Sequence, residues 1–183
     1  MILPIYGYGQ PVLKRVAEDI HHDYSNLKEL IENMWETMYN ANGVGLAAPQ
    51  IGLSIRLFVI DTTQMFKDKD KEKGLKRVFI NAQKIEEKGE EWCYEEGCLS
   101  IPEVRGEVDR PESIILKAMD EKFHETTETF DGINARVIQH EYDHIDGVLF
   151  VDKLSPVRKR LIRGKLAGML KRKVTYDYRM KWK

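Results

Sequence analysis

The chain has 183 residues, which is enough for one domain with its own hydrophobic core. Hydrophobic residues make up 42% and charged residues 32%, an ordinary balance for a globular protein. No apolar run approaches the roughly 20 residues that a membrane helix needs, and the first residues, MILPIYGYGQ, lack the basic and apolar regions of a signal peptide. These features exclude helical membrane proteins and disulfide-rich secreted domains. We therefore expect a cytoplasmic protein in which Cys93 and Cys98 do not form a structural disulfide.

The net charge of −1 conceals a division along the chain. Residues 153 to 183 hold 12 Lys or Arg and one acidic residue, a net of +11, while residues 1 to 152 hold 17 basic and 29 acidic residues, a net of −12. A basic segment is often only a solvated helix face, but a charge of this size also indicates a polyanionic partner. We expect residues 153 to 183 to form a basic helical extension of the domain built by residues 1 to 152.

The first half of the chain predicts one helix followed by a strand. Asn26 can cap this helix, with Glu29 three residues later. The helix should end near residues 40 to 43, where Asn and Gly tolerate positive φ. SIRLFVID at 54–61 predicts a buried strand, and the charged segment 66–77 a solvated loop. An apolar stripe at helical spacing is expected in the core and consists of Leu27, Leu30, Ile31, Met34, Trp35 and Met38.

Several short strands, separated by Gly, Pro or Asp, are predicted next. They cover residues 78–81, 90–95, 103–109, 113–119 and 124–130. Strands in direct succession favour antiparallel pairing over βαβ units.

Two helices are predicted in the last third of the chain. The first begins at Asp131, which can cap it, and ends at Gly147. Sheet should cover it, because apolar residues lie on more than one of its sides: Ile133, Val137, Ile138 and Ile145. The second covers about residues 155 to 173, with a packing stripe of Val157, Leu161, Leu166 and Leu170.

The segment QHEYDH at 139–144 places a glutamate beside the first of two histidines. On an α-helix, positions i and i+4 lie on the same face, so His140 and His144 can bind one metal ion together. Glu141, about 100° around the helix, would lie beside the metal, where a carboxylate can handle the proton of an activated water. The alternative, a helix with solvated charges, is less favoured, because the chain has only five histidines.

The third metal ligand decides between enzyme classes. A thermolysin-like protease would supply a downstream glutamate, but no glutamate follows Glu141. A metzincin would supply a third histidine; the chain matches that motif as far as Gly147, but Phe150 occupies the histidine position. A zinc endopeptidase is therefore the weaker alternative.

A cysteine thiolate upstream can complete the ligand set. Cys98 lies in the turn-like segment EEGCLSIP, and a thiolate is a strong ligand for Zn²⁺ or Fe²⁺. Cys93 is the competing candidate, but it alternates with Trp92 and Tyr94 and is better interpreted as a small buried hydrophobic residue.

Three segments, GVGLAAPQ at 43–50, EGCLS at 96–100 and QHEYDH at 139–144, resemble in order and spacing the signature motifs of peptide deformylases. The resemblance extends over nearly the whole chain. It implies an α+β fold, with antiparallel strands wrapped around a central metal-binding helix and with N-terminal and C-terminal helices. It also implies removal of the formyl group from the N-terminal formylmethionine of nascent bacterial polypeptides, with release of formate.

The resemblance assigns roles by motif position. Cys98, His140 and His144 would hold the metal, Glu141 would be the general acid/base, and Gln50 with the backbone N–H of Leu99 would stabilise the oxyanion. A thiolate with two imidazoles suits Fe²⁺, Zn²⁺, Ni²⁺ or Co²⁺. The resemblance favours Fe²⁺ in the cell, which predicts activity that decays in air.

The glycine-rich segment GVGLAAPQ is a poor nucleotide motif, because no Lys follows its glycines. Gly43 and Gly45 would instead let a strand approach the metal, so that an extended peptide can pair alongside it. Candidates for the methionine pocket are Val44, Leu99, Arg105 and Val137.

Three further residues are candidates for supporting roles. Glu96 and Arg110 could form an ion pair that holds the cysteine loop, although two exposed charges are an equal alternative. Asp143 can support the metal ligands, and Tyr142 is expected only to pack.

The basic extension leaves a second alternative, a nucleic-acid-binding module with a structural metal. A structural site would have four protein ligands and no adjacent carboxylate, unlike the site expected here. The resemblance instead implies a C-terminal helix that docks near the ribosomal exit tunnel. Deletion from Lys171 onward should then weaken ribosome binding and leave short-peptide hydrolysis nearly intact.

Overall fold

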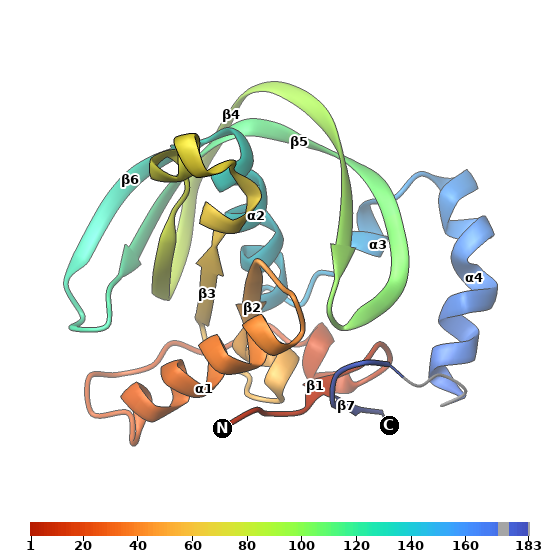
Figure 1. Cartoon of the computed structure of the whole chain (residues 1–183), viewed down its shortest axis with the longest axis horizontal. Coiled ribbons are helices and arrows are strands. Elements are labelled where there is room, and N and C mark those ends of the chain that lie inside the picture. The colour runs from red at the N-terminus through yellow and green to blue at the C-terminus, as the bar shows by residue number, and fades with distance from the viewer. Residues whose placement is uncertain (172–175, 183) are drawn as a thin grey trace.

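The chain folds around one buried helix that a strongly curved antiparallel sheet encloses (Figure 1). This computed structural model describes residues 1–171 and 176–182. The expected α+β class is confirmed. The sheet contains, in spatial order, β2 (Gly45–Ala47), β3 (Leu57–Asp61), β4 (Lys76–Cys98), β5 (Ile101–Met119) and β6 (Glu125–Asp131). The α-helices are α1 (Leu27–Asn40), α2 (Gly132–Ile145), α3 (Phe150–Lys153) and α4 (Pro156–Leu170).

β4 and β5 form one long ribbon that arches over α2 (Figure 1). They have 23 and 19 residues, so the prediction of several short strands was wrong for this region. The glycines and prolines that indicated breaks lie inside the ribbon, where register shifts bend it without ending it. Gly89, for example, has φ 87° and lies at the shift between Lys88 and Glu91. The arch carries the end of β4 back to the side of α2.

α2 is the central element, as its apolar pattern predicted. Ile138 and Ile145 are fully buried, and β2, β3, β5 and β6 all contact the helix. The helix ends at Ile145, and Gly147 adopts a left-handed φ of 73° just beyond it. Asp131 precedes the first turn, but its side chain makes no capping hydrogen bond, so that detail of the prediction was wrong.

α1 packs its predicted apolar face against the opposite side of the sheet. Met34 and Met38 are fully buried there. Asn26 does not cap the helix through its side chain, because its own backbone is left-handed, with φ 57°. Asn42, with φ 54°, redirects the chain after α1 toward β2.

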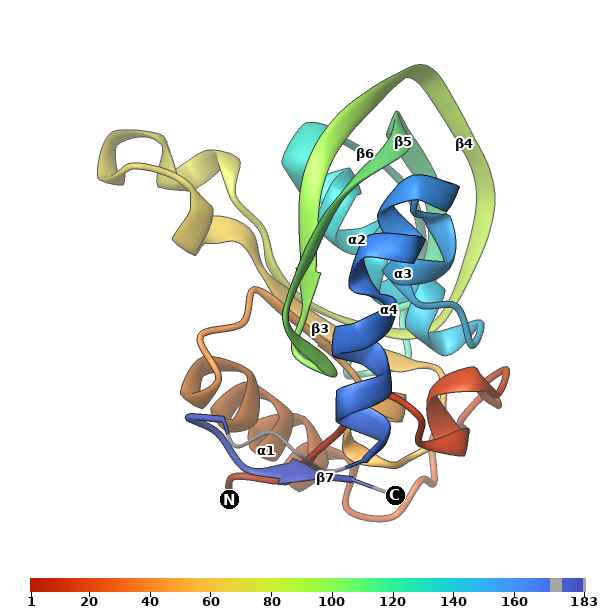
Figure 2. The ribbon, with the colours of Figure 1, turned by 90° about the vertical axis from the view of Figure 1, so that its right-hand side faces the viewer.

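α4 lies across the outside of β5 (Figure 2). Its buried residues are Ile162 and Met169, whereas Val157 and Leu161 of the predicted stripe are 72% and 69% exposed. The buried face consists of Ile162, Leu166 and Met169, at positions i, i+4 and i+7, so Leu166 of the predicted stripe packs against the core while Val157 and Leu161 lie outside the buried face. Residues 172 and 173 of the predicted helix lie outside the described residues.

The C-terminal segment returns to the N-terminus. β7 (Met180–Lys181) pairs in parallel with β1 (Ile5–Tyr6), so the two ends of the chain lie side by side (Figures 1 and 2). No sequence pattern had indicated this pairing. Among the helices of the described residues, none has the length and apolar character needed to cross a membrane.

Candidate metal centre

The fold brings Cys98 to the two histidines of α2. Cys98 is the last residue of β4, and the potential ligand atoms of Cys98, His140 and His144 all lie within 4.8 Å of one another. Cys98 Sγ lies 3.3 Å from His144 Nε2. Ligands bound at about 2.0 to 2.3 Å from one tetrahedral metal are spaced about 3 to 4 Å apart, so this group fits a single ion.

The competing cysteine is elsewhere. Cys93 is exposed on the outer face of β4, and the expectation of a buried residue was wrong. Side chains alternate along a strand, and Trp92 and Tyr94 turn inward to Arg136. Cys93 must therefore face outward.

The donor chemistry of the group also fits a divalent metal with an open position. His140 Nδ1 contacts Glu96 Oε2 at 2.9 Å, which leaves Nε2 of the same ring for a metal. In the described part of the chain, the group holds three ligand residues rather than the four of a structural zinc site. Soft thiolate and borderline imidazole ligands suit Zn²⁺ or Fe²⁺.

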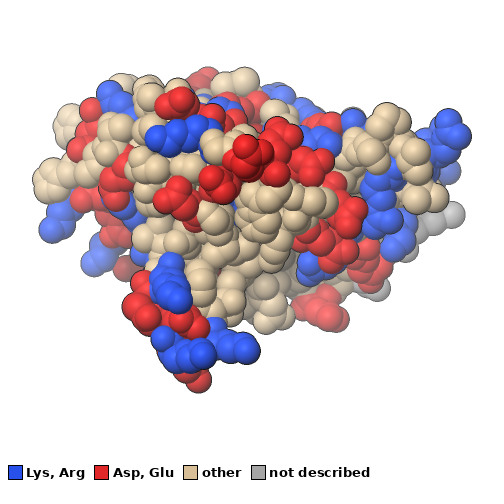
Figure 3. Space-filling model, turned by 90° about the horizontal axis from the view of Figure 1, so that it is seen from above, with Lys and Arg blue, Asp and Glu red and all other residues tan. Residues whose placement is uncertain are grey.

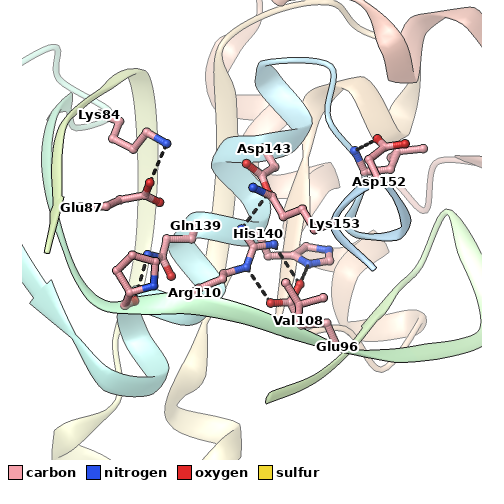
Figure 4. A network of polar contacts seen from close by, with 12 residues as sticks. Lys84, Glu87, Glu96, Val108, Arg110, Gln139, His140, Asp143, Asp152 and Lys153 are labelled. Atoms are coloured by element: carbon pink, nitrogen blue, oxygen red, sulfur yellow. Dashed lines mark hydrogen bonds and ion pairs between the residues drawn. The ribbon is translucent and has the colours of Figure 1, made fainter. Parts of the chain in front are cut away.

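Behind His140 lies a buried network of charges centred on Glu96 (Figure 4). Arg110 donates Nε and Nη2 to the two oxygens of Glu96 at 2.7 and 2.9 Å, and Nη1 to Asp143 at 2.7 Å. The ion pair predicted between Glu96 and Arg110 is confirmed, and so is a supporting contact by Asp143. Burial raises the pKa of Glu96, but hydrogen bonds from Arg110 and His140 outweigh burial and hold it well below its usual range. A permanently ionised carboxylate thus orients the His140 ring.

Glu141 lies between α2 and strand β2. Glu141 is 4% exposed, and its Oε2 has no hydrogen-bond partner among the described residues. Burial raises the pKa of Glu141 to about 7. A nearby divalent cation would lower that value. A buried carboxylate of this kind can both accept and return a proton near neutral pH.

Gln50 and Leu99 flank Cys98. The Gln50 side chain accepts a hydrogen bond from the N–H of Ala47 at 2.9 Å, which turns its amide nitrogen toward the metal group. That nitrogen donates to Ser100 Oγ at 3.2 Å and lies 3.5 Å from Cys98 Sγ. Leu99 follows Cys98 in the tight turn between β4 and β5.

A pocket of about 580 Å³ opens in front of this group. It is lined by Gln50, Cys98, Leu99, His140 and Glu141, and also by the predicted substrate residues Gly43, Val44, Gly45, Arg105 and Val137. β2 forms an edge of the sheet, because it pairs with β3 on one side only among the described residues. An extended chain could pair with this edge.

Gly43 and Gly45 let this part of the chain lie close to Glu141 and Leu99. A Cβ at Gly45 would lie 2.3 Å from Glu141 Oε1, and one at Gly43 would lie 2.7 Å from a methyl group of Leu99. Any larger side chain would displace these neighbours.

Comparison with known proteins identifies the family to which the chain belongs. The family model described as polypeptide deformylase matches residues 2–160. The chain belongs to the polypeptide deformylase family. A peptide deformylase of Flavobacterium johnsoniae is 57% identical, with 100% of this chain and 96% of that protein covered. One of Christiangramia forsetii is 55% identical with the same coverage. The solved peptide deformylase of Thermotoga maritima is 40% identical over 85% of this chain and 99% of that one, with a TM-score of 0.76.

Membership of the deformylase family settles the class of chemistry. The chain is a metal-dependent hydrolase that removes the formyl group from the N-terminal formylmethionine of new polypeptides. The two alternatives, a zinc endopeptidase and a nucleic-acid-binding module, are not supported.

Three residues of this deformylase site were missed by the sequence reasoning. Arg136 is 2% exposed and donates to Glu96 at 3.0 Å. It lies one helical turn before His140 on the same face, and that spacing could have revealed it. Ser100, which bonds Gln50, and Tyr178, at the opposite end of the chain, gave no local signal.

Proposed function

We propose residue roles for the deformylation reaction. Cys98, His140 and His144 hold the metal, which when bound activates water and polarises the formyl carbonyl. The observation that carries this proposal is the convergence of these three ligands beside the buried carboxylate of Glu141.

Glu141 serves as the general acid/base. It accepts a proton from the attacking water and returns it to the leaving amide nitrogen, so that the C–N bond breaks to give formate and a free amine. Gln50 and the backbone N–H of Leu99 stabilise the negative charge that develops on the formyl oxygen. One such donor is typically worth about 3 kcal/mol in the transition state.

The substrate peptide lies along the edge of the sheet at Gly43, Val44 and Gly45. Main-chain pairing there would accept many sequences after the first residue. The apolar surfaces of Val44, Leu99 and Val137, with the stem of Arg105, form the methionine pocket, since all four line the cavity next to the metal group.

Substitutions at two residues test the assignment. Glu141→Ala should keep the metal and lower kcat by about 10² to 10⁴, whereas Cys98→Ala should lose tight metal binding. Metal content and formate release from a formyl-Met peptide are measured for both variants, with an unformylated peptide as the control substrate. Wild-type turnover in either variant would remove that residue from the site.

We propose Fe²⁺ as the metal in the cell, with Zn²⁺, Ni²⁺ or Co²⁺ able to replace it. Fe²⁺ with a thiolate ligand is open to oxidation, so activity should decay in air and persist with Ni²⁺ or Co²⁺. A zinc form that is the most active and insensitive to air would contradict this proposal. We also propose a cytoplasmic location, and a catalytic domain of residues 1–152 extended by residues 153–183.

We further propose that the basic extension binds the ribosome near its exit tunnel. Lys and Arg side chains gather along the side of the molecule where α4 lies (Figure 3). Arg160, Arg163 and Lys171 are exposed there. Binding to ribosomal RNA through phosphates would be weak and strongly dependent on salt.

Deletion of the extension is a poor test of this idea, because Tyr176, Asp177 and Tyr178 line the active-site pocket. The earlier expectation that such a deletion leaves hydrolysis intact is therefore not favoured. Neutralising Arg160, Arg163 and Lys171 with Gln should lower co-sedimentation with ribosomes at low salt and leave hydrolysis of a short peptide unchanged. The matched control neutralises three exposed lysines elsewhere, Lys67, Lys69 and Lys88. An equal loss of ribosome co-sedimentation in both variants would refute a specific role for α4.

A further inference from the structure

The end of the chain forms part of the active-site pocket. Tyr176, Asp177 and Tyr178 line the pocket together with the metal group and the edge at Gly43–Gly45. These residues lie outside the segment, 2–160, that the family model matches. The roles proposed above do not use them.

The C-terminal segment is fixed in place by the N-terminus. The N–H of Ile5 donates to Arg179 O at 2.8 Å, and the N–H of Gly7 donates to Lys181 O at 3.0 Å. Trp182 packs directly on Gly7, where a Cβ would lie 2.1 Å from the indole ring. The segment therefore has a defined register and a seat that only glycine permits.

From this position the Tyr178 hydroxyl donates to the carbonyl oxygen of Leu99 at 2.7 Å. A tyrosine hydroxyl is protonated near neutral pH, and burial raises the pKa of Tyr178 further. The N–H of Tyr8 donates to Ser100 O at 2.9 Å. Two successive carbonyls of the turn after Cys98 are thus held by residues from opposite ends of the chain.

The turn needs such support because it carries the proposed oxyanion donor. The backbone N–H of Leu99 must point at the formyl oxygen to within a few tenths of an ångström to be effective. Tight turns have few hydrogen bonds of their own. A bond at the carbonyl of Leu99 fixes the peptide unit that follows this residue, and so limits the backbone rotations that would turn the N–H of Leu99, in the preceding unit, away from the substrate.

We propose that Tyr178 is a positioning residue for deformylation: it holds Leu99 in the orientation that stabilises the oxyanion, and residues Tyr176–Tyr178 form a wall of the substrate cleft. The proposal rests on the oxyanion role proposed above for Leu99. It adds the described C-terminal segment, residues 176–182, to the active site.

The decisive variant is Tyr178→Phe, which removes the hydroxyl and keeps the ring. Because the bond acts in the transition state more than in substrate binding, kcat should fall about three- to ten-fold while KM changes by less than about two-fold. Metal content and thermal midpoint should match those of the wild type. Tyr24→Phe is the matched control, since Tyr24 is half-buried beside α1 and outside the pocket.

A second variant, Gly7→Ala, tests the contact that holds the C-terminal segment against the N-terminus. Gly7→Ala should displace the Trp182 ring and loosen residues 176–182. The hydrogen bond of Tyr178 should then weaken, so kcat should fall as it does in Tyr178→Phe. The substitution should also raise KM more for a formylated tetrapeptide than for a formylated dipeptide, because the longer peptide reaches further along the wall.

Gln50→Ala separates this proposal from the one on which it rests. If Gln50→Ala lowers kcat and Tyr178→Phe does not, the positioning role is refuted while the oxyanion assignment stands. If neither variant changes kcat, both are refuted. A kcat loss in Tyr178→Phe that follows a loss of metal or of thermal stability would also refute positioning, because it would show a structural role only.

Discussion

Gly45 shows how a single missing side chain can set the geometry of catalysis. The space beside its Cα is filled by the Glu141 carboxylate, with a Cβ position only 2.3 Å from Oε1. The carboxylate therefore approaches the strand edge where the substrate is proposed to lie. A general acid/base works only within hydrogen-bond reach of its proton.

Gly45→Ala should consequently displace Glu141 and lower kcat by about 10²-fold or more, with the metal still bound. Steady-state kinetics and metal analysis check this prediction. Gly168→Ala is a suitable control, because a Cβ there meets no atom within 4 Å among the described residues. Near wild-type turnover in Gly45→Ala would show that Glu141 does not need its present position.

At the residue scale, the sequence predicted what depends on local spacing. His140, Glu141 and His144 share one helix, so their relation follows from helical geometry alone. The role of Tyr178 could not be predicted from the sequence, because its partner Leu99 is 79 residues away in the chain. A contact of that range depends on the complete fold.

Among the elements, the helices were predicted better than the strands. The apolar stripe of α1 was correct, because a 3.6-residue period is sustained over its 14 residues, and the central place of α2 was correct, because apolar residues on more than one side of a helix require burial all round. β4 and β5 were divided wrongly, since bulges allow a strand to continue through a glycine or a proline. The buried face of α4 was predicted wrongly because apolar residues lie on two sides of this helix: Ile162, Leu166 and Met169 pack against the core, whereas Val157 and Leu161 are exposed.

α4 also allows a test of whether the basic extension belongs to the catalytic domain. Gly164 lies inside the helix, and a Cβ there would meet no atom within 4 Å among the described residues. Gly164→Ala should therefore stabilise the helix by about 0.5 to 1 kcal/mol. If α4 unfolds together with the domain, the midpoint of the single urea transition should rise, as followed by circular dichroism. If α4 instead unfolds in a separate transition at lower urea concentration, and only that transition shifts in Gly164→Ala, the extension unfolds independently of the domain.

For the molecule as a whole, the metal should connect parts that are distant in sequence. Its proposed ligands come from the end of β4 and from α2, which are 42 residues apart between Cys98 and His140. A ligand that binds only the folded state stabilises it by about 2.7 kcal/mol at a concentration of 100 times Kd. Removal of the metal should thus lower Tm by about 5 to 10 °C for a chain of this size. Calorimetry with and without a chelator measures the shift, and Cys98→Ala should show none; an unchanged Tm in the wild type would contradict the site.

The pairing of β1 with β7 determines when the enzyme can become complete during its own synthesis. A chain is made from its N-terminus, so Ile5 and Tyr6 emerge from the ribosome long before Met180 and Lys181 have been joined. Forming this contact also costs the conformational entropy of closing a loop that spans almost the whole chain. A nascent copy can fold its helix and sheet, but the wall at Tyr176–Tyr178 forms only after β7 has emerged and paired with β1. An enzyme that acts on unfinished polypeptides therefore completes its own cleft only after β7 of its own chain has been made.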